Sequence, residues 1–209
     1  RKTKDGEDQV QLFVQAIQTL QGRRVTLRIT DAGLALPLSR LGYKKTDLER
    51  LERWLAAPNG LILFAGRSGS GKTTTLYSCL RHLVQSRKGA AIFSIEDMIY
   101  FRLEGIDQIE VDGKDPIACR AAFDQVMRSA PDIVATTLDG EAAARWALDA
   151  AKTGHLILMQ LQAASAREAI KRFESIVGES LEKVPVLVAY QELVCDEGGR
   201  PKAVYTFIE

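Results

Sequence analysis

The sequence is poor in cysteine and lacks long hydrophobic runs. Its three cysteines, Cys79, Cys119 and Cys195, are an odd number without metal-ligand spacing, a pattern that fits a reducing compartment better than a disulfide framework. No apolar run approaches the ~18 residues of a membrane-spanning helix, and no signal-peptide pattern opens the chain. We therefore expect a cytoplasmic protein. Because the first residue is Arg1 rather than Met, we expect the sequence to be a fragment of a longer chain.

An excess of charge of either sign is also missing. The 28 basic residues nearly balance the 27 acidic ones, and the formal net charge is +1. Bulk charge therefore gives no argument for a nucleic-acid or membrane-surface partner, and we expect no nucleic acid to bind. With 209 residues and 46% apolar content, the chain is long enough for one substantial domain with a sizeable core.

The most informative segment follows a short apolar run. Residues 66–73 read Gly-Arg-Ser-Gly-Ser-Gly-Lys-Thr directly after the run 61–65, Leu-Ile-Leu-Phe-Ala. This is the P-loop pattern, in which glycines let backbone N–H groups turn toward a polyphosphate, a lysine reaches the terminal phosphates and a hydroxyl ligates Mg²⁺. A helix that begins near Gly71 adds the positive end of its dipole. The predicted phosphate-binding residues are Gly66, Arg67, Ser68, Gly69, Ser70, Gly71, Lys72, Thr73 and Thr74.

Downstream of residue 44, helical segments alternate with apolar runs. A helix of about three turns is expected after Thr46, because residues 46–49, Thr-Asp-Leu-Glu, fit a capping box. The alternation predicts an α/β fold, a mainly parallel sheet with helices on both faces. A turn at residues 196–199 is expected to return the chain as a last, antiparallel strand. Strands are expected at 61–65, 91–95, 132–136, 155–161, 185–190 and 202–208, and helices at 71–86, 116–129, 140–153 and 165–176.

Apolar residues alternate twice before this region, at 10–16 and again at 25–29. The alternation predicts two strands joined by a turn, although a helix over 10–20 is the alternative, since Phe13 and Ile17 break the strict period of two. Such a hairpin cannot bury a face by itself. We therefore expect residues 1–30 to be the last strands of a preceding α/β domain, residues 31–44 to be a linker and residues 45–209 to be the P-loop domain.

The order of motifs resembles that of the hexameric secretion ATPases, the motors of type II secretion and of type IV pilus assembly and retraction. Residues 60–77 closely follow the Walker A region of that family, and the resemblance spans nearly the whole chain. Ile95-Glu96-Asp97 is similar to the start of the Asp box of the family, and Thr153-Gly154-His155-Leu156 to its His box. Further similar segments lie at 22–29, 41–42, 169–173 and 191–194.

The resemblance implies a RecA-like P-loop ATPase that uses ATP with Mg²⁺. It implies a homo-oligomer, expected to be a hexamer of one subunit or one mixed with an active paralogue, at the cytoplasmic side of the inner membrane with platform proteins of the machine as partners. Glu96 and Asp97 are the expected catalytic carboxylates, Glu96 and Thr73 the expected metal-site residues and His155 an expected phosphate contact. The ordinary alternatives are turn capping for Glu96 and Asp97 and a hydrogen-bonded strand-start histidine for His155.

The chain departs from the family where hydrolysis is catalysed. The last glutamate of the Asp box, which resembles a general base, is replaced by Tyr100, and a tyrosine of pKa ~10 cannot replace a carboxylate as base at neutral pH. The strand expected at 132–136 does not end in the glutamate of the family, and the arginine of the Arg-Asp pair that follows is missing. Asp139 falls near the aspartate of that pair, although helix capping is its simpler role. Gln162 replaces the second histidine of the His box.

These replacements predict a domain that binds ATP but hydrolyses it weakly or not at all, because lost general-base assistance costs ~10²–10⁴-fold in rate. An active motor in which Glu96 positions the water is a second reading. A structural adaptor without nucleotide is a third. A small-molecule kinase is disfavoured, since the sequence has no arginine-rich lid segment.

Overall fold

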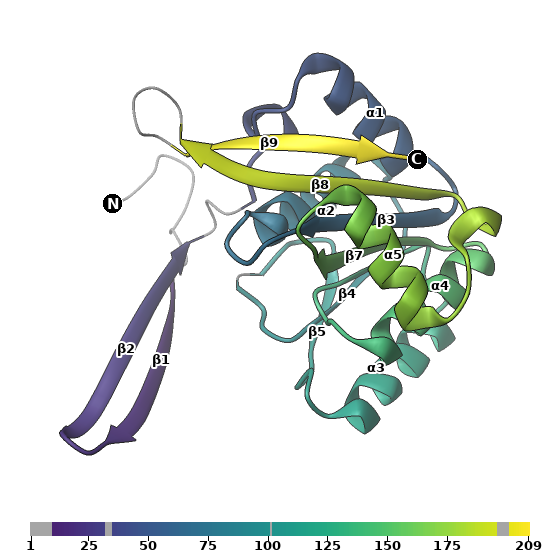
Figure 1. Ribbon diagram of the computed structural model, residues 1–209. Coiled ribbons are helices and arrows are strands. Elements are labelled where there is room, and N and C mark those ends of the chain that lie inside the picture. Colours follow the sequence, from purple (N-terminus) through teal and green to yellow (C-terminus); the bar gives the residue numbers. More distant parts are fainter. Residues whose placement is uncertain (1–9, 32–34, 101, 196–200) are drawn as a thin grey trace.

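The computed structural model describes residues 10–31, 35–100, 102–195 and 201–209, so the turn expected at 196–199 lies outside the described residues (Figure 1). Among the described residues, no helix is long and apolar enough to cross a membrane. The strands are β1 (Val10–Thr19), β2 (Gly22–Asp31), β3 (Gly60–Gly66), β4 (Ile92–Glu96), β5 (Asp107–Glu110), β6 (Ile133–Thr136), β7 (Leu156–Gln162), β8 (Val186–Cys195) and β9 (Pro201–Ile208). The helices are α1 (Lys45–Leu55), α2 (Lys72–Ser86), α3 (Pro116–Arg128), α4 (Glu141–Lys152) and α5 (Ala166–Val177), with short 3₁₀ turns η2 (Leu38–Arg40) and η3 (Leu181–Lys183).

A seven-stranded sheet forms the centre of the molecule. Its strands lie in the order β5-β4-β6-β7-β3-β8-β9, all parallel to their neighbours except β9, which is antiparallel to β8. Every residue of β3 is buried, as expected of a parallel strand that is covered on both faces. The structure confirms the predicted α/β fold, and it brings the carboxyl ends of β3, β4, β6 and β7 to one edge of the sheet.

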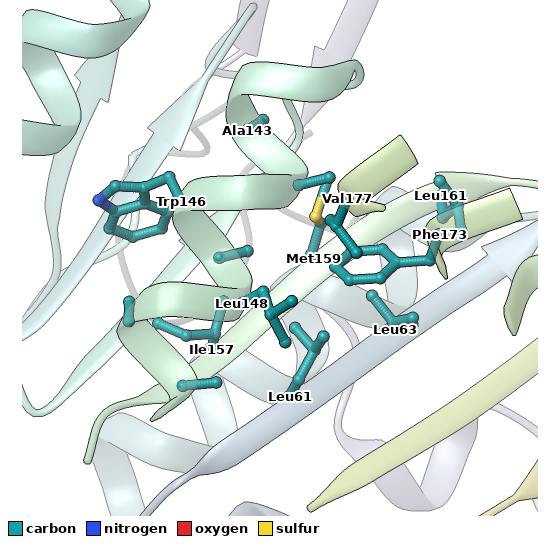
Figure 2. Packing of buried hydrophobic residues seen from close by; sticks show 14 of the residues in the cluster. Leu61, Leu63, Ala143, Trp146, Leu148, Ile157, Met159, Leu161, Phe173 and Val177 are labelled. Carbon is teal, nitrogen blue, oxygen red and sulfur yellow. The ribbon is translucent and has the colours of Figure 1, made fainter. Parts of the chain in front are cut away.

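Helices cover both faces of this sheet. Alternate residues of β3 point to opposite sides, so that Leu61 and Leu63 pack with α3, α4 and α5, while Ile62 and Phe64 pack with α1 and α2. Figure 2 shows the first of these clusters, in which the Phe173 ring of α5 lies beside Leu63. Burial of these apolar side chains on both faces is the main stabilisation of the fold.

Several predicted elements differ from the structure. The predicted capping box at Thr46 is wrong, because Lys44 is the N-cap of α1 and places Thr46 inside the first turn. Strand β5 was not expected, since its sequence Asp-Gln-Ile-Glu is mostly polar and it pairs only with β4. Strand β8 continues five residues beyond the predicted end at residue 190, to Cys195, where it pairs with β9.

Strands β1 and β2 form a separate hairpin that extends away from the main body in Figure 1. The helix considered over 10–20 is therefore wrong. Antiparallel pairing sets Leu12 opposite Ile29 and Val14 opposite Leu27, which gathers these apolar side chains on one face. They are 55–70% exposed. The apolar face of the hairpin is therefore uncovered among the described residues.

Residues 35–43 follow the hairpin within the segment expected to be a linker. Leu38 and Leu41 are buried in the cluster that also contains side chains of α1 and α2. Arg81 of α2 donates a hydrogen bond to the carbonyl of Ala35 at 2.8 Å. The part of this segment that the structure describes is therefore packed onto the P-loop domain.

Candidate nucleotide-binding site

The loop between β3 and α2 has the backbone shape that a phosphate cradle needs. Gly69 and Gly71 have φ angles of 75° and 91°, the left-handed region that glycine adopts without strain. A Cβ atom added to Gly66 would lie 2.5 Å from both the backbone oxygen of Gln191 and Oγ of Ser70. Gly66 is therefore required by close packing, whereas Gly69 and Gly71 are required by backbone conformation.

Lys72 crosses the loop from the first turn of α2. Its Nζ atom donates to the carbonyls of Gly66 at 3.0 Å and Arg67 at 2.8 Å. Burial lowers the pKa of the Lys72 ammonium below its ordinary value, and the carboxylate of Asp139 opposes this shift. The N-cap of α2 is Gly71, which has no side chain to cap the helix, so no side-chain cap competes with a ligand for the N–H groups of the first turn. Loop and helix together fit the phosphates of a nucleotide.

Thr73, one residue further along α2, approaches the neighbouring strand β7. Its Oγ1 atom lies 3.4 Å from Oε1 and 3.3 Å from Nε2 of Gln160, which is 9% exposed. A threonine hydroxyl at this point is the expected protein ligand of a nucleotide-bound Mg²⁺, an ion that keeps several water and phosphate ligands. Among the described residues, no group of three or more His, Cys, Asp or Glu side chains is arranged to hold a metal ion.

Glu96 ends β4 on the same sheet edge but points into the protein. Its side chain is completely buried, and its carboxylate accepts hydrogen bonds from the hydroxyl of Tyr77, from Ser94 at 2.6 Å and from Gln108 at 3.2 Å. Burial, reinforced by the carboxylate of Glu96, raises the pKa of Tyr77, so the phenol remains a donor. Two strands, β6 and β7, separate β4 from β3, an offset of about 14 Å at the usual strand spacing.

Asp97, the second predicted catalytic carboxylate, is exposed and holds a turn. Its Oδ1 atom accepts a hydrogen bond from the N–H of Gly113 at 2.9 Å, and its own N–H donates to Oγ1 of Thr137 at 3.2 Å. A Cβ atom on Gly113 would lie 3.0 Å from the same Oδ1 atom. These contacts match the turn-capping alternative for Asp97.

His155 lies at the other end of the sheet. It precedes β7, its carbonyl accepts from Gly60 at the start of β3, and its Nδ1 atom is 2.8 Å from the carbonyl of Pro131. Gln162, at the far end of β7, is in register with Gly66. The length of the strand separates His155 from the loop of the same subunit by about 20 Å. His155 therefore lies far from the phosphate-binding loop of its own chain, and its contacts are those of a hydrogen-bonded strand-start histidine.

The carboxylate of Asp139 opposes the lowering of the Lys72 pKa. The sequence put this residue near the aspartate of the family's Arg-Asp pair, with helix capping as its simpler role. It follows β6, and its Oδ2 atom lies 3.7 Å from Nη2 of Arg172. Arg172 also donates to the carbonyl of Gln162 at 2.8 Å, next to Gly66 in the sheet. The sequence alone could have placed Asp139 at the site, because it is the first acidic residue after β6 and ligands of α/β sheets bind at the carboxyl ends of strands.

Tyr100, which replaces the last glutamate of the family's Asp box, is half-buried. Its ring meets that of Phe13 in an edge-to-face contact, with centroids 6.1 Å apart, and packs against the core on the α2 side of the sheet. Its backbone N–H faces the hydroxyl of Tyr77 at 3.3 Å. The position thus joins the hairpin to the core through aromatic contacts.

The parallel sheet and the glycine-rich loop together define a P-loop nucleotide-binding domain. A family model described as "Type II/IV secretion system protein" matches residues 2–196. The chain therefore belongs to the type II/IV secretion system protein family.

Two similar relatives are the type II secretion system protein E of Klebsiella pneumoniae, 36% identical over 170 residues, and the type IV pilus assembly ATPase PilB of Acinetobacter baylyi, 34% identical over 168 residues. The first alignment covers 80% of this chain and 34% of the relative, the second 78% and 28%. The matched region is thus about a third of the length of these relatives.

Among solved structures, the pilus retraction motor PilT with bound ADP superimposes with a TM-score of 0.82. The match covers 97% of this chain and 63% of PilT at 23% identity. At this level of identity the match supports the fold alone.

Proposed function

We propose that this chain is the nucleotide-binding domain of a secretion or pilus motor ATPase, that it binds ATP with Mg²⁺ at residues 66–74, and that it hydrolyses ATP weakly. The observation that carries the proposal is the contrast between the open phosphate-binding loop and the buried carboxylate of Glu96, which the protein's own donors already occupy. Lys72 and Thr73 lie at this loop, where they would contact the phosphates and the Mg²⁺ ion of a bound nucleotide. Glu96, the acidic residue that ends β4, is occupied in the core.

Weak hydrolysis follows from what phosphoryl transfer requires. The protein contributes mainly by positioning the attacking water and stabilising charge on the transferred group. A carboxylate that already accepts from Tyr77, Ser94 and Gln108 must break buried hydrogen bonds before it can orient a water molecule. Tyr100 and Gln162 provide no carboxylate or imidazole in their place. These observations favour the binding domain over the reading in which Glu96 positions the water.

The assembly is part of the same proposal. We infer a homo-oligomer, expected to be a hexamer, that works with platform proteins at the cytoplasmic side of the inner membrane, as the resemblance to secretion motors suggests. The apolar face of the β1–β2 hairpin supports the view that residues 1–30 are the end of a preceding domain. Residues 45–209 form the P-loop domain in this proposal, and residues 31–44 connect the two.

Calorimetric titration of ATP with Mg²⁺ into the purified chain tests nucleotide binding. We expect saturable binding that Lys72→Ala weakens at least ~100-fold, because the variant loses a charged contact to the phosphates, worth more than a neutral hydrogen bond. Lys88→Ala, at an exposed position after α2, is the control and should bind normally. A wild-type chain that binds no nucleotide would favour the structural adaptor instead.

A specific observation supports an active enzyme as the second candidate. The carboxylate of Asp139 opposes the lowering of the Lys72 pKa and lies beside Arg172 near the end of β7, so in this candidate Asp139 orients the attacking water. In that case Asp139→Asn abolishes turnover and leaves ATP affinity nearly unchanged. Under the first candidate, turnover is weak in the wild type.

A further inference from the structure

Gln191 lies directly beneath the phosphate-binding loop, at the point where β8 passes the end of β3. Its side chain is 1% exposed, and its Nε2 atom donates a hydrogen bond to the backbone carbonyl of Ser70 at 2.7 Å. The partners are 121 residues apart in sequence. A distant strand thus holds one peptide unit of the loop.

The loop is packed against this residue without spare room. A Cβ atom on Gly66 would lie 2.5 Å from the backbone oxygen of Gln191, and one on Gly71 would lie 3.1 Å from its Nε2 atom. Because a real Cβ atom fits at neither place without a shift of its neighbours, the two glycines bring the loop backbone down onto Gln191. The close contact between the loop and Gln191 therefore depends on glycine at positions 66 and 71.

The direction of this hydrogen bond decides where the next N–H group points. In a trans peptide unit, the C=O and N–H groups point in opposite directions. Gln191 draws the carbonyl of Ser70 toward β8, so the N–H of Gly71, in the same peptide unit, points away from β8 toward the open side of the loop. That side is where the phosphates of the proposed nucleotide would lie.

Two buried polar atoms at this contact have no hydrogen-bond partner among the described residues. They are Oε1 of Gln191 and Oγ of Ser70. Buried polar groups without partners are rare in native proteins and are tolerated mainly where function requires the arrangement. Their presence beside the Nε2–Ser70 hydrogen bond indicates that this place in the structure favours the geometry of the loop over local satisfaction of polar groups.

We propose that Gln191 is a positioning residue of the nucleotide site, which holds the Ser70–Gly71 peptide so that the N–H of Gly71 faces the bound phosphates. This inference deepens the proposed function and depends on it. Gln191 does not touch the nucleotide. It acts through the loop, and it links nucleotide binding to the strand pair β8–β9.

The test is ATP binding by Gln191→Met in the full chain, with Gln85→Met on the exposed side of α2 as matched control. Methionine keeps the approximate length of the side chain and removes the donor, so we expect roughly tenfold weaker binding of ATP with Mg²⁺. The control should bind like wild type. Equal affinities of wild type and Gln191→Met would overturn the inference, whereas a wild type that does not bind would overturn the proposed function as well.

A spectroscopic measurement separates positioning from general support of the fold. In the ¹⁵N-labelled wild type, the Gly71 amide resonance should shift when ADP and Mg²⁺ are added. In Gln191→Met the shift should be smaller even when the protein is saturated with ADP. A full shift in the variant contradicts the inference. If Gln191→Met fails to fold, Gln191→Glu retains size and polarity but places an acceptor against the Ser70 carbonyl, and it must weaken binding at least as much.

Discussion

The carboxyl ends of β3 and β4 lie on the same edge of one sheet, yet they differ in what their polar groups face. At β3, backbone groups of residues 66–71 and the side chain of Lys72 form an open cradle. At β4, the carboxylate of Glu96 faces inward and accepts hydrogen bonds from Tyr77, Ser94 and Gln108. Placement at the functional edge of an α/β sheet therefore does not by itself make a residue part of the site.

The comparison also separates two kinds of polar chemistry. The cradle uses backbone N–H groups, which a local run of glycines arranges, and it stays available to a ligand. The glutamate uses a side chain whose hydrogen-bond donors come from α2, β5 and its own strand β4, and these bonds hold it in the core. A domain that keeps the backbone cradle open while its glutamate is hydrogen-bonded in the core can hold a nucleotide without activating water.

The largest effect is expected at the close contact under β3. Gly66→Ala places a methyl group 2.5 Å from a backbone oxygen, and overpacking of this kind costs about 3 kcal/mol of the free energy of unfolding. Nucleotide binding should be lost with it. Gly69→Ala, where a Cβ atom meets nothing within 4 Å, should cost only the ~1–2 kcal/mol of a left-handed backbone. Urea denaturation and calorimetry measure both, and equal losses in the two variants would contradict the packing argument.

At the end of β4, the expected effect is on stability instead of binding. Glu96→Gln converts one acceptor into a donor that faces buried donors, which should lower the free energy of unfolding by ~1–3 kcal/mol. ATP affinity should remain within about twofold, a change of under ~0.5 kcal/mol. Asp97→Asn, at the exposed neighbouring position, serves as control and should change stability by less than about 1 kcal/mol. A Glu96→Gln variant of full stability and altered nucleotide affinity would contradict the assignment of Glu96 to the core instead of the nucleotide site.

The pH dependence of ATP binding tests whether the charged ammonium of Lys72 contacts the phosphates. Because burial lowers the pKa of this ammonium in the free protein and phosphate binds its charged form, raising the pH through that lowered value removes a favourable contact. ATP affinity should therefore start to fall at a lower pH than it would for a lysine of ordinary pKa ~10.4. Lys72→Arg, which remains charged throughout this range, should not show the decline. Calorimetry at a series of pH values makes the comparison.

The smallest effect is expected in the hairpin. Leu27→Thr changes a side chain that is 59% exposed on the apolar face of β2, so the free energy of unfolding of the main domain should change by less than ~0.5 kcal/mol. Tryptophan fluorescence follows that domain, since Trp54 and Trp146 both lie in it. A loss above 1.5 kcal/mol would mean that the hairpin face is covered in solution.

The sequence predicted the sheet, its helices and the phosphate cradle because each depends on local pattern. Apolar runs such as 61–65 specify buried parallel strands, and the loop motif lies within eight residues. The roles of the polar residues were harder to predict, since Glu96 depends on Tyr77 and Gln108 from other elements. For His155, the expected parallel strand at 155–161 already puts the histidine at the end of the sheet opposite the loop, a separation that the His box motif by itself does not show.

Steady-state ATP hydrolysis by the purified, assembled chain at saturating ATP and Mg²⁺ tests the central claim most directly. We expect stoichiometric binding together with turnover at least ~100-fold below the ~1–10² s⁻¹ of ordinary enzymes. Turnover within that ordinary range, abolished by Lys72→Ala, would contradict the claim.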